Sequence, residues 1–231
     1  MNANDPNIAA VELVAIALGA LREELVLVGG CSVGLLITDH ARPPARQTVD
    51  VDLVAEVTST TEFYALCEKL RQCGFSERAD AGHMCRWHKG SLILDVMPSD
   101  ESVLGHSSNR WYSEAVRSAM RTRLPRGTDM LVVSPPLFLA TKLEAFYGRG
   151  GGDFGHHDME DIINVIDGRA ELLDEVDHAT ANVREYLREE FDDLLADSSF
   201  VDGIGMHLRP DAVSQARVQR IIGSIRRLAG L

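Results

Sequence analysis

The spacing of hydrophobic residues changes along the chain, and the changes predict its secondary structure. Residues 8–23 carry apolar side chains at helical intervals, which is typical of an amphipathic helix. Residues 25–28 form a short apolar run that suits a buried strand. Gly29 and Gly30 end this run, and residues 32–37 return to helical spacing. The N-terminal part therefore predicts a helix, a strand, a glycine turn and a second helix.

The next part of the chain predicts further strands. Residues 49–54 alternate between apolar and polar positions, which indicates a strand with one apolar and one acidic face. Further predicted elements are a helix over 60–73 with Thr60 or Thr61 as its N-cap, strands over 83–88 and 91–96 joined through Lys89-Gly90, and a short strand over 131–133.

The last hundred residues show only helical patterns. Pro135-Pro136 can open a helix that runs to about Tyr147, and a glycine-rich loop follows over 148–155. The later predicted helices cover about 158–166, 170–176, 179–196 and 211–228. The predicted fold is α/β (α+β): a small mixed sheet with flanking helices over residues 1–133, then a helical domain over 134–231.

Composition and charge narrow the class of protein. The chain has 231 residues, of which 45% are hydrophobic and 25% charged, an ordinary globular composition. The net charge of -12 argues against a broad basic face that coats nucleic acid. Basic residues nevertheless cluster at 110–126 and 217–227, so a local basic groove stays open. The arginines of 110–126 are surface charge or, alternatively, hold an acceptor RNA.

The sequence also predicts a cytoplasmic location without a membrane partner. No apolar run approaches the ~20 residues of a membrane-spanning helix. The first six residues contain Asp5 and no basic residue, unlike a secretory signal. The four cysteines lack CxxC spacing, so we interpret them as free thiols in a reducing compartment.

The glycine turn is the first candidate for binding chemistry. Gly29 and Gly30 lie between a predicted strand and a predicted helix, where glycine lets the backbone approach a ligand closely. The helix that follows, which includes Ser32, would present N–H groups and a positive dipole end to a triphosphate.

Three aspartates are the candidates for metal binding. Asp50 and Asp52 are two residues apart on a predicted strand, so both carboxylates share one face. Paired carboxylate oxygens suit Mg²⁺. Asp95 lies in an apolar strand, where a metal or a nearby cation would offset its burial. Three such carboxylates could hold two metals for displacement at phosphorus, and Asp95 could act as a base.

These motifs, in this order, resemble those of the polymerase-β-type nucleotidyltransferases. The second half contains Lys142 within KLEAF, then Arg149, then HDMEDI over residues 157–162. That run is similar to the AbiEii/AbiGii and MenT-like toxin nucleotidyltransferases. The resemblance covers about residues 25–166. Family members commonly carry an arginine shortly before the DxD motif, whereas this chain has Arg46 followed by Gln47-Thr48.

The resemblance implies an activity, a cofactor and a site. The activity would be Mg²⁺-dependent transfer of a nucleotidyl group from an NTP to an acceptor, such as tRNA. The chain would be the toxin of a toxin–antitoxin or phage-defence pair, with a cognate antitoxin as partner. The implied catalytic residues are Asp50, Asp52, Asp95, Lys142 and Asp161, with Asp50, Asp52 and Asp95 as metal ligands. The implied nucleotide-binding residues are Gly29, Gly30, Ser32, Lys142 and Asp158.

Each assignment has a simpler alternative. The paired aspartates could be a solvated strand face, and Asp95 an ordinary edge-strand acid. Lys142 could extend along an amphipathic helix toward water. Asp158 and Asp161, which share a helix face, could stabilise the helix N-terminus. Two further alternatives concern other kinds of site: a zinc site at His156-His157-Asp158 and a nucleophilic role for Cys31.

Two rival functions remain open at the level of sequence. The first is nucleotidylation of a small molecule such as an aminoglycoside, because a cationic drug suits an acidic protein. The second is a non-catalytic binding member of the same fold, against which the complete set of aspartates and Lys142 speaks.

Overall fold

The computed structural model describes residues 5–39, 41–77, 85–103 and 109–231. These residues group into two compact units. The sheet unit contains residues up to Leu35 and then Pro43–Ser134. The helical unit contains Leu36–Arg42 and Pro135–Leu231. The α/β fold is confirmed, and all the strands of the sheet lie in the sheet unit.

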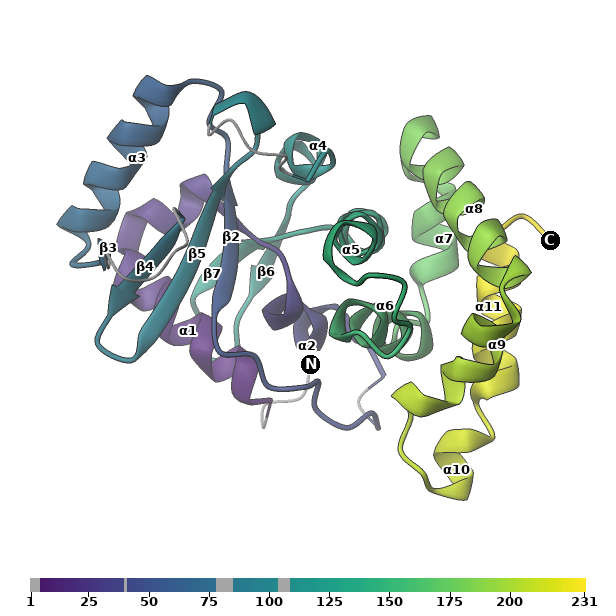
Figure 1. The fold of residues 1–231 in the computed structure, drawn as a ribbon. Coiled ribbons are helices and arrows are strands. Elements are labelled where there is room, and N and C mark those ends of the chain that lie inside the picture. Colours follow the sequence, from purple (N-terminus) through teal and green to yellow (C-terminus); the bar gives the residue numbers. More distant parts are fainter. Residues whose placement is uncertain (1–4, 40, 78–84, 104–108) are drawn as a thin grey trace. The chain divides into compact units, whose positions relative to one another are not determined.

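A seven-stranded mixed sheet forms the centre of the sheet unit (Figure 1). Its order is β3-β4-β5-β2-β1-β7-β6. The pairs β1/β7 and β2/β5 are parallel, and the other neighbours are antiparallel. The strands are β1 (Leu25–Leu27), β2 (Val51–Ala55), β3 (Ser76–Glu77), β4 (Arg86–Lys89), β5 (Leu92–Pro98), β6 (Met120–Arg123) and β7 (Asp129–Val132).

Helices accompany the sheet and form most of the second unit. The sheet unit contains α1 (Pro6–Leu18), η1 (Gly19–Glu24), η2 (Gly30–Ser32), α3 (Thr60–Gln72), η3 (Glu101–Val103) and α4 (Tyr112–Arg117), while α2 (Val33–Leu36) bridges the division between the units. The helical unit contains α5 (Pro135–Arg149), α6 (His157–Gly168), α7 (Leu172–Asp177), α8 (Ala181–Ala196), α9 (Ser198–Gly203), η4 (Ile204–His207), α10 (Ala212–Gln215) and α11 (Val218–Leu228).

The structure departs from the predicted elements in a few places. The short strand β3, helix α4 and strand β6 were not predicted. The pattern gave no sign of β6 because its alternating Met120-Arg121-Thr122-Arg123 lies at the sheet edge and buries none of its residues. The N-cap of α3 is Ser59, whose hydroxyl accepts from the Glu62 N–H, rather than Thr60 or Thr61.

Two predicted helices are interrupted. The helix predicted over 8–23 ends at Leu18, because Gly19 takes a positive φ of 57° and a 3₁₀ segment follows. The helix predicted over 32–37 is a 3₁₀ turn plus the four residues of α2. So short a helix adds little dipole to the glycine turn. The helix predicted over 211–228 is divided into α10 and α11 by a turn in which Arg217 N–H bonds to Ser214 O.

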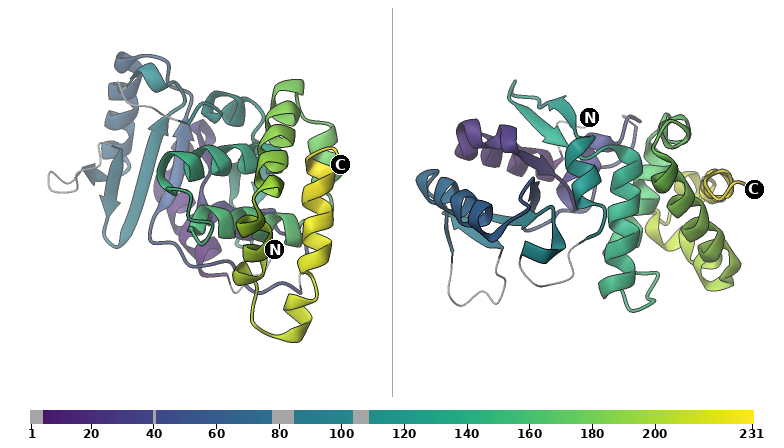
Figure 2. Two further views of the ribbon diagram at one scale, coloured as in Figure 1. Left: turned by 45° about the vertical axis from the view of Figure 1, so that its right-hand side comes forward. Right: turned by 90° about the horizontal axis from the view of Figure 1, so that it is seen from above.

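The core of the helical unit is formed where its helices pack together. Helix α5 contacts α6, α7 and α8, and α8 runs beside α11 (Figures 1 and 2). Phe138, Phe146, Phe191 and Phe200 are fully buried side chains of this unit. None of the helices in the described part of the chain has both the length and the apolar character needed to cross a membrane.

The segment Leu36–Arg42 is attached to the helical unit by polar contacts. The backbone N–H groups of Thr38 and Asp39 both donate to Gly168 O at 3.0 Å. Arg169 donates in turn to Leu36 O at 2.6 Å. These bonds hold the segment against the C-terminal end of α6, although its flanking residues belong to the sheet unit.

A buried ion pair completes this attachment. Arg42 pairs with Asp167, and both side chains are almost fully buried. Arg217 and Arg220 approach the same carboxylate at 3.2 and 2.5 Å. Burial lowers the pKa of Arg42 and the Asp167 charge partly opposes that shift. Asp167 is therefore the counter-charge for three arginines drawn from two regions of the helical unit.

We expect Asp167→Asn to destabilise the protein, because it removes the carboxylate that pairs with the buried Arg42. Removing one partner of a buried ion pair costs about 3–5 kcal/mol. The matched control is Asp129→Asn, whose carboxylate pairs with Arg123 at a far more exposed position and should cost within about 1 kcal/mol. Urea unfolding followed by circular dichroism measures both losses. Equal losses in the two variants would contradict the structural role of Asp167.

Candidate active site

The glycine turn after β1 lies directly against Asp52. Val28 N–H donates to Asp52 O at 3.0 Å, which fixes the turn beside β2. Gly29 takes a positive φ of 65°. A Cβ atom added there would lie only 2.0 Å from Asp52 Oδ2, so no larger residue fits without displacing that carboxylate. Ser32 is buried, and its hydroxyl donates to Gly29 O at 2.7 Å, which stabilises the turn.

Three carboxylates gather on two neighbouring strands beside this turn. Strands β2 and β5 are parallel, with Asp52 and Asp95 as register partners. Register partners on adjacent strands are about 4.8 Å apart and point to the same face. Asp50 directly precedes β2, two positions before Asp52. The sheet thus brings together the three aspartates that the sequence predicted as metal ligands.

Arg86 joins two of these carboxylates. Its Nε and Nη2 donate to the two oxygens of Asp95 at 2.8 and 2.6 Å, and Nη2 also donates to Asp50 Oδ2 at 2.5 Å. The hydrogen bond to Asp95, with the charges of the nearby aspartates, raises the pKa of Arg86 above its ordinary value. The guanidinium is therefore permanently charged and neutralises part of the carboxylate group.

The hairpin of β4 and β5 explains why Arg86 reaches Asp95. Lys89 pairs with Leu92, so the two-residue turn is Gly90-Ser91 rather than Lys89-Gly90. In this register Arg86 lies directly opposite Asp95. Sequence reasoning asked for a cation near Asp95 but did not identify Arg86. The hairpin spacing was the signal that could have found it.

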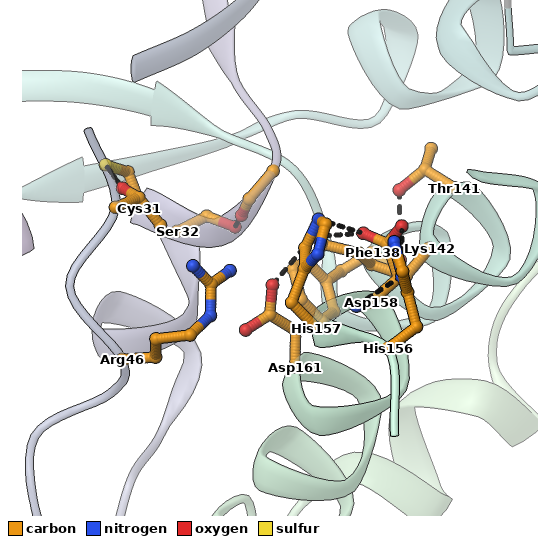
Figure 3. A network of polar contacts seen from close by, with 12 residues as sticks. Cys31, Ser32, Arg46, Phe138, Thr141, Lys142, His156, His157, Asp158 and Asp161 are labelled. Atoms are coloured by element: carbon orange, nitrogen blue, oxygen red, sulfur yellow. Dashed lines mark hydrogen bonds and ion pairs between the residues drawn. The ribbon is translucent and has the colours of Figure 1, made fainter. Parts of the chain in front are cut away.

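The helical unit contains a second charged cluster around Lys142 (Figure 3). The ammonium of Lys142 in α5 donates to Asp158 Oδ1 at 2.8 Å and to Asp161 Oδ2 at 2.7 Å, both in α6. Arg149 donates two further bonds to Asp158 at 2.8 and 2.9 Å. Lys142 is 4% exposed, so it does not extend along the helix surface toward water.

The pKa shifts in this cluster have a common cause. Burial alone would raise the pKa of Asp158, but the bonds and charges of Arg149 and Lys142 hold it well below its usual value. Burial would likewise lower the pKa of Lys142, and the two aspartates raise it instead. Lys142 and Asp158 are thus ionised together. Asp158 is not the N-cap of α6, because His156 Nδ1 accepts its backbone N–H at 3.2 Å.

His156, His157 and Asp158 bring three possible metal-ligand atoms within 4.8 Å of one another. Both oxygens of Asp158 already accept hydrogen bonds from Lys142 or Arg149. The Nδ1 atom of His156 is used in capping. A cation at this point would meet two cationic side chains, so the geometry does not favour a zinc site.

Cys31, another alternative considered from the sequence, lies beside the glycine turn. Its sulfur is 2.8 Å from Thr48 Oγ1 and 3.3 Å from Asp50 O. Burial raises the pKa of this thiol to about 12. A thiol with so high a pKa carries almost no thiolate at neutral pH and is a poor nucleophile.

The structure thus places the predicted residues in two groups. Gly29, Gly30 and Ser32 accompany the three aspartates in the sheet unit, and Lys142, Asp158 and Asp161 form one cluster in the helical unit. The predicted approach of Lys142 and Asp161 to the paired aspartates concerns residues of different units and stays a prediction.

No family model and no curated protein matches this chain. Solved structures do. One is an antigenic nucleotidyltransferase-like protein from Paracoccidioides brasiliensis, with a TM-score of 0.46 and 24% identity over 71% of this chain and 76% of that chain. Another is a candidate nucleotidyltransferase from H. pylori, with a TM-score of 0.47 and 11% identity over 96% of this chain and 94% of that chain.

We expect Lys142→Met to destabilise the protein by about 3–5 kcal/mol, because two buried carboxylates lose their shared cation. Lys69→Met is the matched control: Lys69 pairs with Glu24 on the surface, and its loss should cost within about 1 kcal/mol. Urea unfolding gives both values. The double variant Lys142→Met/Asp161→Asn should lose less than the sum of its single variants, since the two residues interact. Wild-type stability in Lys142→Met would contradict this account.

The lowered pKa of Asp158 predicts a dependence of stability on pH. A carboxyl whose pKa is lower in the folded state contributes stability that is complete above about pH 5 and is lost as the pH falls below about 4. Asp158→Asn should therefore melt at a lower temperature at pH 7 and lose less of its remaining stability between pH 5 and pH 2. The control Asp129→Asn should keep a slope closer to that of the wild type. If the melting temperatures of the wild type and Asp158→Asn changed in parallel with pH, the lowered pKa of Asp158 would be refuted.

Proposed function

We propose that this chain is a nucleotidyltransferase of the polymerase-β type, which moves a nucleotidyl group from an NTP to an acceptor. One observation carries the proposal: the Asp52 side chain lies against the Gly29 turn and in register with Asp95. A phosphate-binding turn and the metal-binding carboxylates must adjoin in such an enzyme, because the same triphosphate contacts both.

The residues present fit a divalent metal. Asp50, Asp52 and Asp95 supply hard carboxylate oxygens, the ligand type that Mg²⁺ prefers. The Nη2 atom of Arg86 lies within hydrogen-bonding distance of Asp50 and Asp95 at once, so a cation between these carboxylates is already favourable. The carboxylate side chains of Asp50 and Asp95 are 30% and 18% exposed, so a metal can reach them from solvent.

The roles of the protein groups follow from this placement. When bound, Mg²⁺ would neutralise charge on the triphosphate and stabilise the departing pyrophosphate. Gly29 and Gly30 let the backbone lie close to the phosphates. Asp95 accepts the proton of the acceptor hydroxyl, whose oxygen forms the new bond to the α-phosphorus as the bond to pyrophosphate breaks.

The proposed acceptor is an RNA such as tRNA, and the proposed role is that of a toxin with a cognate antitoxin. Both rest on the resemblance of residues 25–166 to the AbiEii/AbiGii and MenT-like enzymes. The arginines near β6 add little support for RNA binding, because Arg121 and Arg123 pair with Glu23 and Asp129. Lys142 and Asp161 are proposed to complete the site, with Lys142 facing the triphosphate and Asp158 assisting nucleotide binding.

The test is transfer of label from each α-labelled NTP, with Mg²⁺, to total RNA or to a set of aminoglycosides. We expect Asp50→Asn, Asp52→Asn and Asp95→Asn each to lower the rate about 100-fold or more, because charge stabilisation at the phosphates is lost. The control Asp129→Asn removes a half-buried carboxylate of β7 that pairs with Arg123, outside the proposed metal site, and should keep the wild-type rate. Thermal melts check that each variant is folded.

The outcomes separate the hypotheses. Labelled RNA supports the proposed acceptor, whereas labelled aminoglycoside supports the small-molecule alternative. Full activity in Asp52→Asn would remove the metal assignment. An absence of label on every acceptor would favour a non-catalytic member of the fold.

A further inference from the structure

The position of Arg86 has a consequence for metal binding. The guanidinium bonds to Asp50 and Asp95, two of the three residues proposed to hold the metal. All three bonds are between 2.5 and 2.8 Å, the range of charge-assisted hydrogen bonds. A metal ion at these carboxylates would lie close to the guanidinium, so the two cations would repel each other and compete for the same negative charge.

The local structure lets the side chain move while the strand stays in place. Trp87, the next residue, is completely buried, and Arg86 pairs in register with Asp95 through the β4/β5 ladder. These features fix the backbone of β4. The Arg86 side chain, in contrast, is 23% exposed and long enough to turn toward a ligand on the same face of the sheet.

We propose that Arg86 is a resident counter-ion that competes with divalent metal for Asp50 and Asp95, so that metal binds weakly alone and tightly together with the nucleotide. The triphosphate supplies the compensation, because its oxygens offer the displaced guanidinium a new bidentate partner. This inference rests on the proposed function and adds a condition to it: the metal and the NTP bind cooperatively.

The competition predicts a specific energetic pattern. Without nucleotide, metal binds these carboxylates against the charge of Arg86 and at the expense of its charge-assisted bonds. Removal of the guanidinium therefore raises the affinity of the free protein for metal. In the wild type, bound nucleotide offsets the cost of displacing Arg86 by accepting hydrogen bonds from it. Metal and nucleotide therefore raise each other's affinity by the same factor.

The experiment measures Mn²⁺ binding by the decrease of its free electron-paramagnetic-resonance signal, in the wild type, Arg86→Gln and Arg123→Gln. Arg123→Gln is the matched control. It removes an arginine of the edge strand β6 that pairs with Asp129 on β7, away from β4 and β5 in the strand order. Without nucleotide, Arg86→Gln should bind Mn²⁺ at least about tenfold more tightly than the wild type or the control. A non-hydrolysable NTP analogue should raise Mn²⁺ affinity more in the wild type than in Arg86→Gln.

Thermal melting supplies a second readout that needs no catalysis. Mn²⁺ should raise the melting temperature of Arg86→Gln more than that of the wild type, because ligand binding stabilises the folded state according to affinity. If Arg86→Gln does not fold, Arg86→Lys serves instead. It keeps the charge but loses the bidentate geometry, and its Mn²⁺ affinity should lie above that of the wild type.

Two results overturn the proposal, and they differ in what they leave standing. Equal Mn²⁺ affinity in wild type and the Arg86 variants, with binding lost in Asp52→Asn, refutes the competition and leaves the proposed function intact. No Mn²⁺ binding in any of these proteins, with or without the analogue, refutes both.

Discussion

Carboxylates that lie close together repel one another unless a cation lies among them, and this constraint shapes both units of the protein. Arg86 joins Asp50 to Asp95, while Lys142 joins Asp158 to Asp161. The two groups differ in their access to water. Lys142, Asp158 and Asp161 are buried, so loss of the Lys142 ammonium leaves carboxylate charges in a medium that solvates them poorly. The Arg86 group is partly exposed, so water can solvate its carboxylates when the guanidinium moves. The first group is therefore suited to architecture and the second to chemistry.

Much of the fold and of the proposed site could be predicted from the sequence, and the parts that could not have identifiable physical causes. The apolar periodicity gave the sheet half, the helical half and the strand that carries Asp52, because burial on one face leaves a regular pattern. The role of Arg86 was not predicted, because its partner depends on the register of the β4/β5 hairpin. A turn at Lys89-Gly90 would have placed residue 84 opposite Asp95, whereas the observed turn at Gly90-Ser91 places Arg86 there. Strand β6 was not predicted, because an edge strand with mostly polar side chains lacks the buried apolar face that produces a recognisable pattern.

Between the glycine turn and the paired aspartates, the chain passes through both units. After the glycine turn, the segment Leu36–Arg42 joins the helical unit, and the chain then returns to the sheet unit before Asp50. The glycine turn and the paired aspartates are therefore connected by a segment that Asp167 and Gly168 hold in the helical unit. Local spacing in the sequence did not indicate that Leu36–Arg42 belongs to the helical unit, because tertiary contacts alone decide which unit a short connection joins. A change at Asp167 consequently acts on a segment tied at both ends to residues proposed for catalysis.

Lys142 shows why activity and stability have to be measured together in this protein. An ammonium has three N–H donors, and two of them already serve Asp158 and Asp161. Contact with a triphosphate would use the remaining donor, or would require one carboxylate to give up its bond while buried. Loss of activity in a Lys142 variant is thus expected from either a catalytic or an architectural role. Only a variant that keeps the wild-type unfolding free energy and still loses transfer would assign Lys142 to the chemistry, because a purely architectural lysine links the two losses.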